Sequence, residues 1–104
     1  FISFDQIADR IKKSDLLVNA SPVGMKEGDG SIVDINLLHE KLWIYDVVYN
    51  RQTQLFKDAK LRKRPAVNGL GMLLYQGVLA FEIWTGKKPA PVDVMREALI
   101  RQLK

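Results

Sequence analysis

Short apolar runs alternate with segments of helical period along this chain, and that alternation constrains its fold more than any other feature. The apolar runs cover residues 16–20, 42–49 and 65–68, and the second is rich in aromatic and β-branched residues. Apolar residues at helical spacing mark the segments before, between and after these runs, at 4–13, 34–41, 55–64, 69–86 and 92–103. Alternation of this kind is typical of an α/β layer with parallel strands and right-handed crossovers. The sequence therefore predicts about three parallel strands followed by two closing helices.

Local signals mark several helix ends. Ser3 and Gln6 fit a capping box, Asp34 fits an N-cap, and Gly86 stands where a C-cap glycine is expected. The two tryptophans, Trp43 and Trp84, lie in apolar runs and are interpreted as core residues.

Composition excludes several classes of site. The 104 residues include no cysteine and one histidine, so a disulfide framework, a thiolate metal site and a multi-histidine metal site are all excluded. No apolar run approaches the roughly 18 residues that a membrane span needs, and the first residues do not resemble a signal peptide. The chain also starts without Met, which suggests that it was cut from something longer.

Polar residues and glycines follow each predicted strand, at 19–25, 46–50 and 68–72. Ligands of open parallel sheets bind beyond the carboxyl ends of the strands, so these groups are candidate ligand contacts. Turn chemistry alone would also place Asn, Gly and Pro there, and both interpretations stay open. No general base, nucleophile or metal site emerges. The glycine pattern that begins at Gly69 and Gly71 lacks its third glycine, because Leu74 stands there.

Gln76 and Tyr49 are the sharpest single candidates. The helical neighbours of Gln76 are apolar, so its amide needs partners. It either bonds nearby backbone or lies at the mouth of a pocket and donates to a ligand hydroxyl. Tyr49 ends an apolar strand, where it either packs or directs its hydroxyl into a polar cleft.

Three motifs together resemble the shikimate dehydrogenases, or more broadly the shikimate/quinate dehydrogenase family. Residues 19–25 read Asn-Ala-Ser-Pro-Val-Gly-Met, like the family's N-A-T/S-P-x-G-M segment. Residues 46–49 resemble its D-x-x-Y segment, and residues 68–77, followed by 80–86, resemble its N/D-G-L-G-M-L-x-x-Q-A/G helix start. Two departures are mild: Ser21 stands where Thr is common, and Arg51 where Pro is frequent.

The resemblance implies a function and a set of contacts. The family reduces 3-dehydroshikimate to shikimate, reversibly and mostly with NADPH, on the route to chorismate and the aromatic amino acids. Tyr49 and Gln76 would contact the substrate. The cofactor contacts implied by the resemblance are Asn19, Ala20 and Ser21 along the ribose and phosphate side, with Val47, Gly69 and Met72 around the nicotinamide.

The resemblance also implies what lies elsewhere. Residues 1–104 would form the C-terminal half of a Rossmann-like, doubly wound NADP-binding domain, together with its closing helices. The family's catalytic Lys and Asp, its N-terminal substrate domain and its glycine-rich phosphate turn have no match here, so this chain is expected to hold no catalytic residue and no activity alone. Self-association, or a completing N-terminal fragment, is expected to cover the open sheet. A cytoplasmic enzyme without a membrane partner is expected.

Two alternatives remain. The first is a quinate or dual quinate/shikimate dehydrogenase. The second belongs to another class: a small basic module that binds nucleic acid, suggested by the net charge of +4. It would need a basic stripe with exposed aromatic side chains, whereas an ordinary solvated surface also accounts for this charge.

Overall fold

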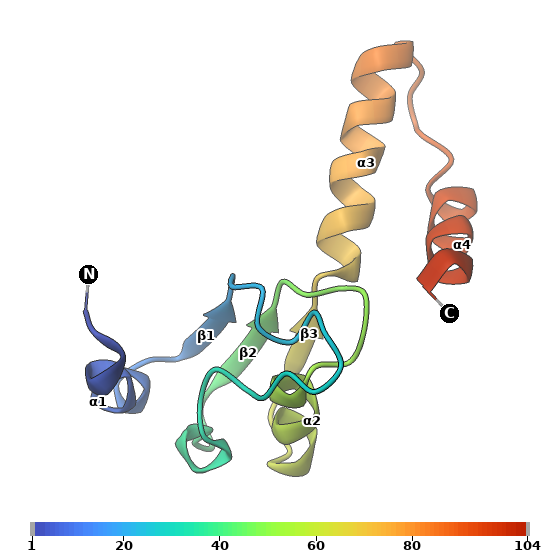
Figure 1. Ribbon diagram of the computed structural model, residues 1–104. Coiled ribbons are helices and arrows are strands. Elements are labelled where there is room, and N and C mark those ends of the chain that lie inside the picture. Colours follow the sequence, from blue (N-terminus) through green and yellow to red (C-terminus); the bar gives the residue numbers. More distant parts are fainter. Residues whose placement is uncertain (1, 104) are drawn as a thin grey trace.

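Three parallel strands form the single sheet of the computed structural model, which describes residues 2–103 (Figure 1). The strands are β1 (Leu16–Asn19), β2 (Trp43–Asp46) and β3 (Ala66–Asn68), hydrogen-bonded in the order β1-β2-β3. The α/β class and the three parallel strands are therefore confirmed. All three strands are shorter than the predicted runs, and β2 ends at Asp46, where a loop begins.

Within residues 2–103, four α-helices and two 3-10 turns precede, connect and follow the strands. They are η1 (Phe4–Gln6), α1 (Ile7–Lys12), η2 (Ile35–Leu37), α2 (Gln54–Leu61), α3 (Leu70–Thr85) and α4 (Val92–Leu103). Gly86 caps α3 in the left-handed conformation, at φ 67°, as predicted.

Two local predictions about the first half of the chain are wrong. The helix expected at 34–41 is only the three-residue turn η2, although Asp34 does cap it by accepting the Asn36 N–H at 2.8 Å. The chain leaves the helical conformation at Leu38, and this places Leu38 and Leu42 in the core. The capping box at Ser3 is absent, because its hydroxyl donates to the Asp5 carboxylate instead.

One core covers only one face of the sheet. Ile44 of β2 packs there with Ile11 of α1, Leu38, and Leu55 and Ala59 of α2. The strand register places Leu17, Ile44 and Ala66 side by side, so these residues share that face.

The opposite face of the sheet, called here the bare face, is apolar and uncovered. Its residues are Leu16, Val18, Trp43, Tyr45 and Val67, all exposed except the half-buried Tyr45. Trp43 is 58% exposed, so the prediction that it lies in the core is wrong for this chain.

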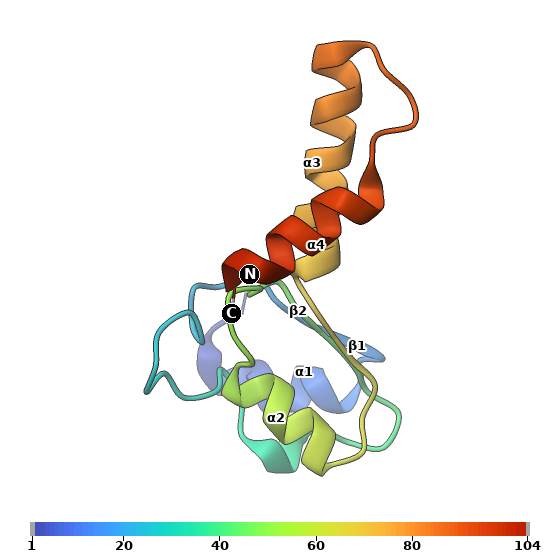
Figure 2. The same ribbon diagram turned by 90° about the vertical axis from the view of Figure 1, so that its right-hand side faces the viewer.

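A second, smaller core lies between α3 and α4, which form a hairpin that stands away from the sheet (Figures 1 and 2). Leu74 and Val78 of α3 pack there against Met95 and Leu99 of α4. α3 is apolar nearly all round, so much of it stays uncovered: Trp84 is 83% exposed, which also contradicts a core position. The radius of gyration is 16.2 Å, against about 13 Å for a compact domain of this length.

No helix within residues 2–103 has the length and apolar character needed to cross a membrane.

Candidate functional site

The carboxyl ends of all three strands meet at one edge of the sheet, called here the carboxyl edge. Asn19, Asp46 and Asn68 end their strands in register with one another. The loops 20–25 and 47–53 and the start of α3 leave from this edge. The three polar segments that the sequence indicated are therefore brought together, as the parallel arrangement requires.

A buried carboxylate lies at the centre of the carboxyl edge. Asp46 is 0% exposed and accepts three hydrogen bonds. Its Oδ1 accepts from the Asn19 Nδ2 and from the Val48 N–H, both at 3.1 Å, and its Oδ2 accepts from the Thr53 hydroxyl. Thr53 is also the N-cap of α2, where its Oγ1 accepts the Phe56 N–H at 3.1 Å. One carboxylate thus ties the end of β1, the loop after β2 and the start of α2 together.

Asn19 extends this network into the loop after β1. Its Oδ1 accepts from the Ser21 N–H at 3.1 Å and from the Ser21 hydroxyl at 2.6 Å. Its Nδ2 also donates to the Val23 carbonyl at 3.1 Å. With 1% of its surface exposed, Asn19 has its side chain fully engaged in holding this loop.

The rim of the carboxyl edge is held at three further points. Gly24, at φ 107°, packs so closely on Thr53 that a Cβ would lie 2.6 Å from the threonine methyl. The Asp29 carboxylate accepts from the Gly24 N–H at 2.9 Å and the Lys26 N–H at 3.2 Å, and these bonds lower the pKa of Asp29. Asn50 donates to the carbonyl of Met25 at 3.1 Å, which joins the two loops.

Gly69 is buried where β3 turns into α3. A Cβ at this position would lie 1.8 Å from the Val47 carbonyl oxygen and 2.5 Å from its carbon, so only glycine fits. The Gly69 N–H donates to the Val48 carbonyl at 3.2 Å. Gly69 thus brings the start of α3 against the Val47 backbone.

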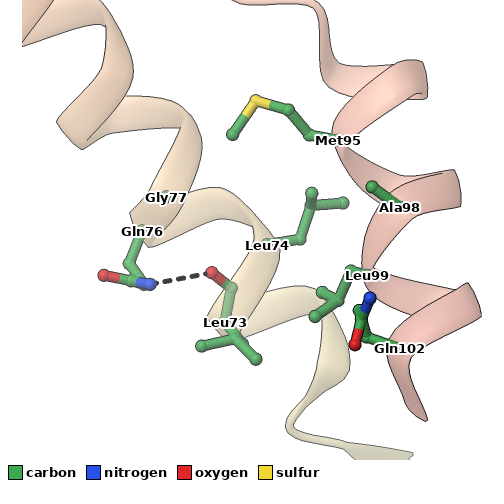
Figure 3. Close-up of a pocket in the computed structure, with 8 residues that line it drawn as sticks. All are labelled: Leu73, Leu74, Gln76, Gly77, Met95, Ala98, Leu99 and Gln102. Carbon is green, nitrogen blue, oxygen red and sulfur yellow. Dashed lines mark hydrogen bonds between the residues drawn. The ribbon is translucent and has the colours of Figure 1, made fainter.

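Gln76 lies on α3 beside a groove between α3 and α4. Its Nε2 donates to the Leu73 carbonyl at 3.1 Å, and its side chain points away from α4, whereas Leu74 points toward it (Figure 3). The exposed amide is thus satisfied by nearby backbone, one of the two expected arrangements. It also lies at the mouth of a groove of about 420 Å³, lined mostly by apolar side chains of the two helices.

Two smaller hollows open at the carboxyl edge. One, of about 410 Å³, lies on the loop after β1 and is lined by Pro22, Val23, Met25, Lys26 and Asp29. The other, of about 220 Å³, lies between the loop after β2 and the end of α4, which runs back toward the sheet (Figure 2). Its lining includes Tyr49, Asn50, Arg51, Asn68 and Leu103.

The predicted contact residues fall into two groups. Asn19 and Gly69 are buried and serve the fold, whereas the others are exposed or half-buried at the carboxyl edge or on α3. These are Ala20, Ser21, Val47, Tyr49, Met72 and Gln76. Sequence reasoning missed Thr53 and did not single out Asp46. A charged residue ending an apolar strand, with a threonine at a helix start seven residues later, was the available signal.

Comparison with known proteins shows what this chain is similar to. Residues 69–100 match the family described as the Shikimate 5'-dehydrogenase C-terminal domain. Over 103 residues the chain is 46% identical to the shikimate dehydrogenase (NADP(+)) of Methanopyrus kandleri, an alignment that covers 96% of this chain and 35% of that protein.

The chain matches the C-terminal part of shikimate dehydrogenases in sequence and in fold.

Solved structures of this family share the fold. The Thermus thermophilus shikimate dehydrogenase in complex with NADP(H) and shikimate matches with a TM-score of 0.78 and 32% identity, over 99% of this chain and 38% of that one. Quinate dehydrogenase from Corynebacterium glutamicum in complex with NAD matches with a TM-score of 0.87 and 35% identity, over 96% of this chain and 36% of that one. The Rossmann-like prediction is confirmed. The chain spans about a third of the length of the shikimate dehydrogenases that it matches.

Proposed function

We propose that the protein to which this chain belongs is an NADP-dependent shikimate dehydrogenase, which reversibly reduces 3-dehydroshikimate to shikimate. The observation that carries the proposal is the match to shikimate dehydrogenases over nearly the whole chain, with the motif residues gathered at the carboxyl edge and on the adjoining α3. Tyr49 and Gln76 stand in the segments that resemble the motifs of that family. The match also favours the enzyme over the small nucleic-acid-binding module.

The exposed groups at the carboxyl edge fit the nicotinamide end of the cofactor. Val47 and Met72 present apolar surface suited to a flat ring, and they flank the point where Gly69 brings α3 against the strand end. Ala20 and Ser21 lie at the end of β1, where they would face the ribose and phosphate side. The cofactor, when bound, supplies the hydride.

The substrate would be held by polar groups on the two sides of this edge. Tyr49, 38% exposed, carries a hydroxyl that can donate to or accept from a substrate hydroxyl or carboxylate. Gln76 can release its bond to the Leu73 carbonyl and donate to the substrate instead, because this bond lies on the exposed surface. The proton-transfer Lys and Asp, the substrate domain and the glycine-rich phosphate turn are proposed to lie outside residues 1–104.

A spectrophotometric assay tests the proposal. The purified protein is mixed with shikimate and NADP, and the absorbance of reduced cofactor is followed. Tyr49→Phe and Gln76→Ala should each raise the KM for shikimate, by roughly 5- to 30-fold for one lost hydrogen bond to a polar ligand. The 104-residue chain alone should show no turnover. Robust turnover by this chain alone would contradict the placement of the catalytic residues elsewhere.

A second candidate, quinate dehydrogenase, is favoured by one observation: the fold match to the Corynebacterium glutamicum quinate dehydrogenase, with a TM-score of 0.87. Comparing kcat/KM for shikimate and quinate, each with NADP and with NAD, separates the candidates. A higher kcat/KM with quinate would replace the main proposal with this one.

The partner of this chain is proposed to be the remaining part of the same protein. The bare face and the uncovered surface of α3 are both apolar, and the sheet is open at both edges. Residues such as Leu79, Ile83 and Trp84 would otherwise leave a large apolar patch in water. Without that part, the 104-residue chain should self-associate, which light scattering would detect. A clean monomer at high concentration would contradict this.

The cytoplasmic location expected from the family resemblance stays a prediction, which fractionation of cells would test.

A further inference from the structure

We infer that Asp46 is a positioning residue: its buried carboxylate fixes the loops after β1 and β2 relative to each other, and so sets the placement of Val47 and Tyr49. The effect on catalysis rests on the proposed function. The hydrogen bonds by which Asp46 joins the two loops are a property of this chain and do not depend on that function.

The hydrogen-bond directions support a carboxylate hub. The Val48 N–H and the Asn19 amide nitrogen can only donate, and both meet Asp46 Oδ1 at 3.1 Å. Thr53 uses its oxygen to accept the Phe56 N–H, so its proton is free to go to Oδ2 of Asp46. Both carboxylate oxygens therefore act as acceptors, and no buried side-chain nitrogen or oxygen atom among the described residues is left without a partner.

The hub acts directly on the residues proposed to touch ligand. The Val48 amide belongs to the peptide that follows Val47, and Tyr49 is the next residue. The hydrogen bond to this amide therefore fixes the backbone from which both side chains leave. The Val47 N–H donates to the Asn19 carbonyl at 3.0 Å, so Asn19 holds the same segment from the other side.

The hub also links the loop after β1 to the loop after β2. Through Asn19 it holds Ser21 and the Val23 carbonyl, and through Thr53 it holds the surface on which Gly24 packs. Because a shift of about 1 Å in a positioning group can lower catalysis by orders of magnitude, loss of this hub should weaken productive binding without removing any ligand contact.

Three variants test the inference in the full-length protein. Asp46→Ala removes all three acceptor bonds and should raise the KM for shikimate about tenfold or more. Asp46→Asn keeps one oxygen that can accept from Asn19 and Val48, and it should recover the KM to within about threefold of wild type. Thr53→Val keeps a methyl against Gly24 but removes the hydroxyl, and with it both the bond to Asp46 and the N-cap bond from Phe56. Loss of the Asp46 bond should raise the KM by roughly fivefold, and loss of the cap should also lower stability.

Asp34→Ala is the matched control. Asp34 caps η2 through an acceptor bond of the same kind, at 2.8 Å to the Asn36 N–H. The η2 turn packs through Ile35 and Leu37 on the core under the sheet, not on the loops of the carboxyl edge. It should lower stability slightly and leave the KM unchanged. An Asp46→Asn variant as impaired as Asp46→Ala would overturn the positioning role, because the charge would then matter rather than the hydrogen bonds. A wild-type KM in Thr53→Val would overturn it as well, and this variant decides the question if Asp46→Ala does not fold.

Hydrogen exchange of backbone amides separates this inference from the proposed function. In Asp46→Ala, the amides of Val48 and Ser21 should exchange at least tenfold faster, while those of α3 and α4 keep their rates. Should the wild-type protein show no turnover with shikimate, the proposed function fails and the exchange experiment still decides the hub. Unchanged exchange at Val48 and Ser21 would overturn the inference whatever the activity.

Discussion

Replacing Gly69 by alanine should be far more damaging than an alanine in a glycine position usually is. The added Cβ would lie 1.8 Å from the Val47 carbonyl oxygen, whereas a Cβ essentially never comes within 3.0 Å of such an atom. The two groups must therefore separate by at least 1.2 Å, the difference between these distances. The obstacle is backbone on both sides, so no side-chain rotation relieves it.

The magnitude follows from what this separation disrupts. The Gly69 N–H bond to the Val48 carbonyl, now 3.2 Å, moves out of hydrogen-bonding range. A buried hydrogen bond contributes about 1 kcal/mol, and overpacking of a buried site typically costs about 1–3 kcal/mol. Gly69→Ala should therefore lower the free energy of unfolding by about 2–4 kcal/mol. Because Gly69 has φ −77°, which any residue can adopt, the loss comes from the clash and not from backbone conformation.

Gly71→Ala provides the control two residues further along the chain. A Cβ at Gly71 meets nothing within 4 Å, and the residue lies inside α3. Alanine there should raise helix stability by about 0.5–1 kcal/mol. Urea denaturation of the purified protein, followed by circular dichroism, measures both variants. Equal free energies of unfolding for Gly69→Ala and wild type would refute the reasoning, as would a loss of similar size in Gly71→Ala.

Three further outcomes are expected. The N–H groups of Gly24 and Lys26 lower the pKa of Asp29 in the folded protein. The Asp29 carboxylate should therefore stabilise its loop fully above about pH 4, the ordinary carboxyl range, and this stabilisation should be lost as the pH falls through the lowered pKa. The NMR shift of the Gly24 amide should follow this titration, and the pH dependence should be absent in Asp29→Asn. Gly86→Ala should lower the free energy of unfolding by about 1 kcal/mol, because Gly86 has φ 67°, a conformation that alanine rarely adopts, in open space. Gly86→Asn should lower it by less, because asparagine adopts this left-handed conformation more readily. Equal losses for the two variants in urea denaturation would contradict this expectation. The neutral His39 ring should carry its proton on Nε2, because Nδ1 accepts the Lys41 N–H and Nε2 lies 3.0 Å from each of two carbonyl oxygens. Nitrogen NMR that showed the proton on Nδ1 would refute this assignment.

Periodicity predicted most of the elements because each buries one face. α4 begins and ends at the predicted residues, and α3 ends at the predicted glycine, since local patterning and caps determine such helices. The helix expected at 34–41 failed for a tertiary reason: leaving the helical conformation at Leu38 puts Leu38 and Leu42 into the core beneath the sheet. The prediction that Trp43 and Trp84 lie in the core is wrong for a different reason: residues 2–103 do not provide the surfaces that would cover them.

The sequence by itself determined the parallel α/β class, the carboxyl edge as the place of interest and the family motifs, because strand period, turn residues and short motifs are local properties. Tertiary structure alone decided which of the predicted contact residues are exposed and which are buried. The family resemblance implies that Asn19 and Gly69 contact the cofactor. The structure shows in addition that the Asn19 side chain bonds a loop network and that Gly69 packs against the Val47 carbonyl. Asp46 and Thr53 gain their importance only when the ends of β1, β2 and the start of α2 come together. The hydrogen bond from Asn19 to Asp46 joins residues 27 positions apart in sequence, and no local pattern encodes it.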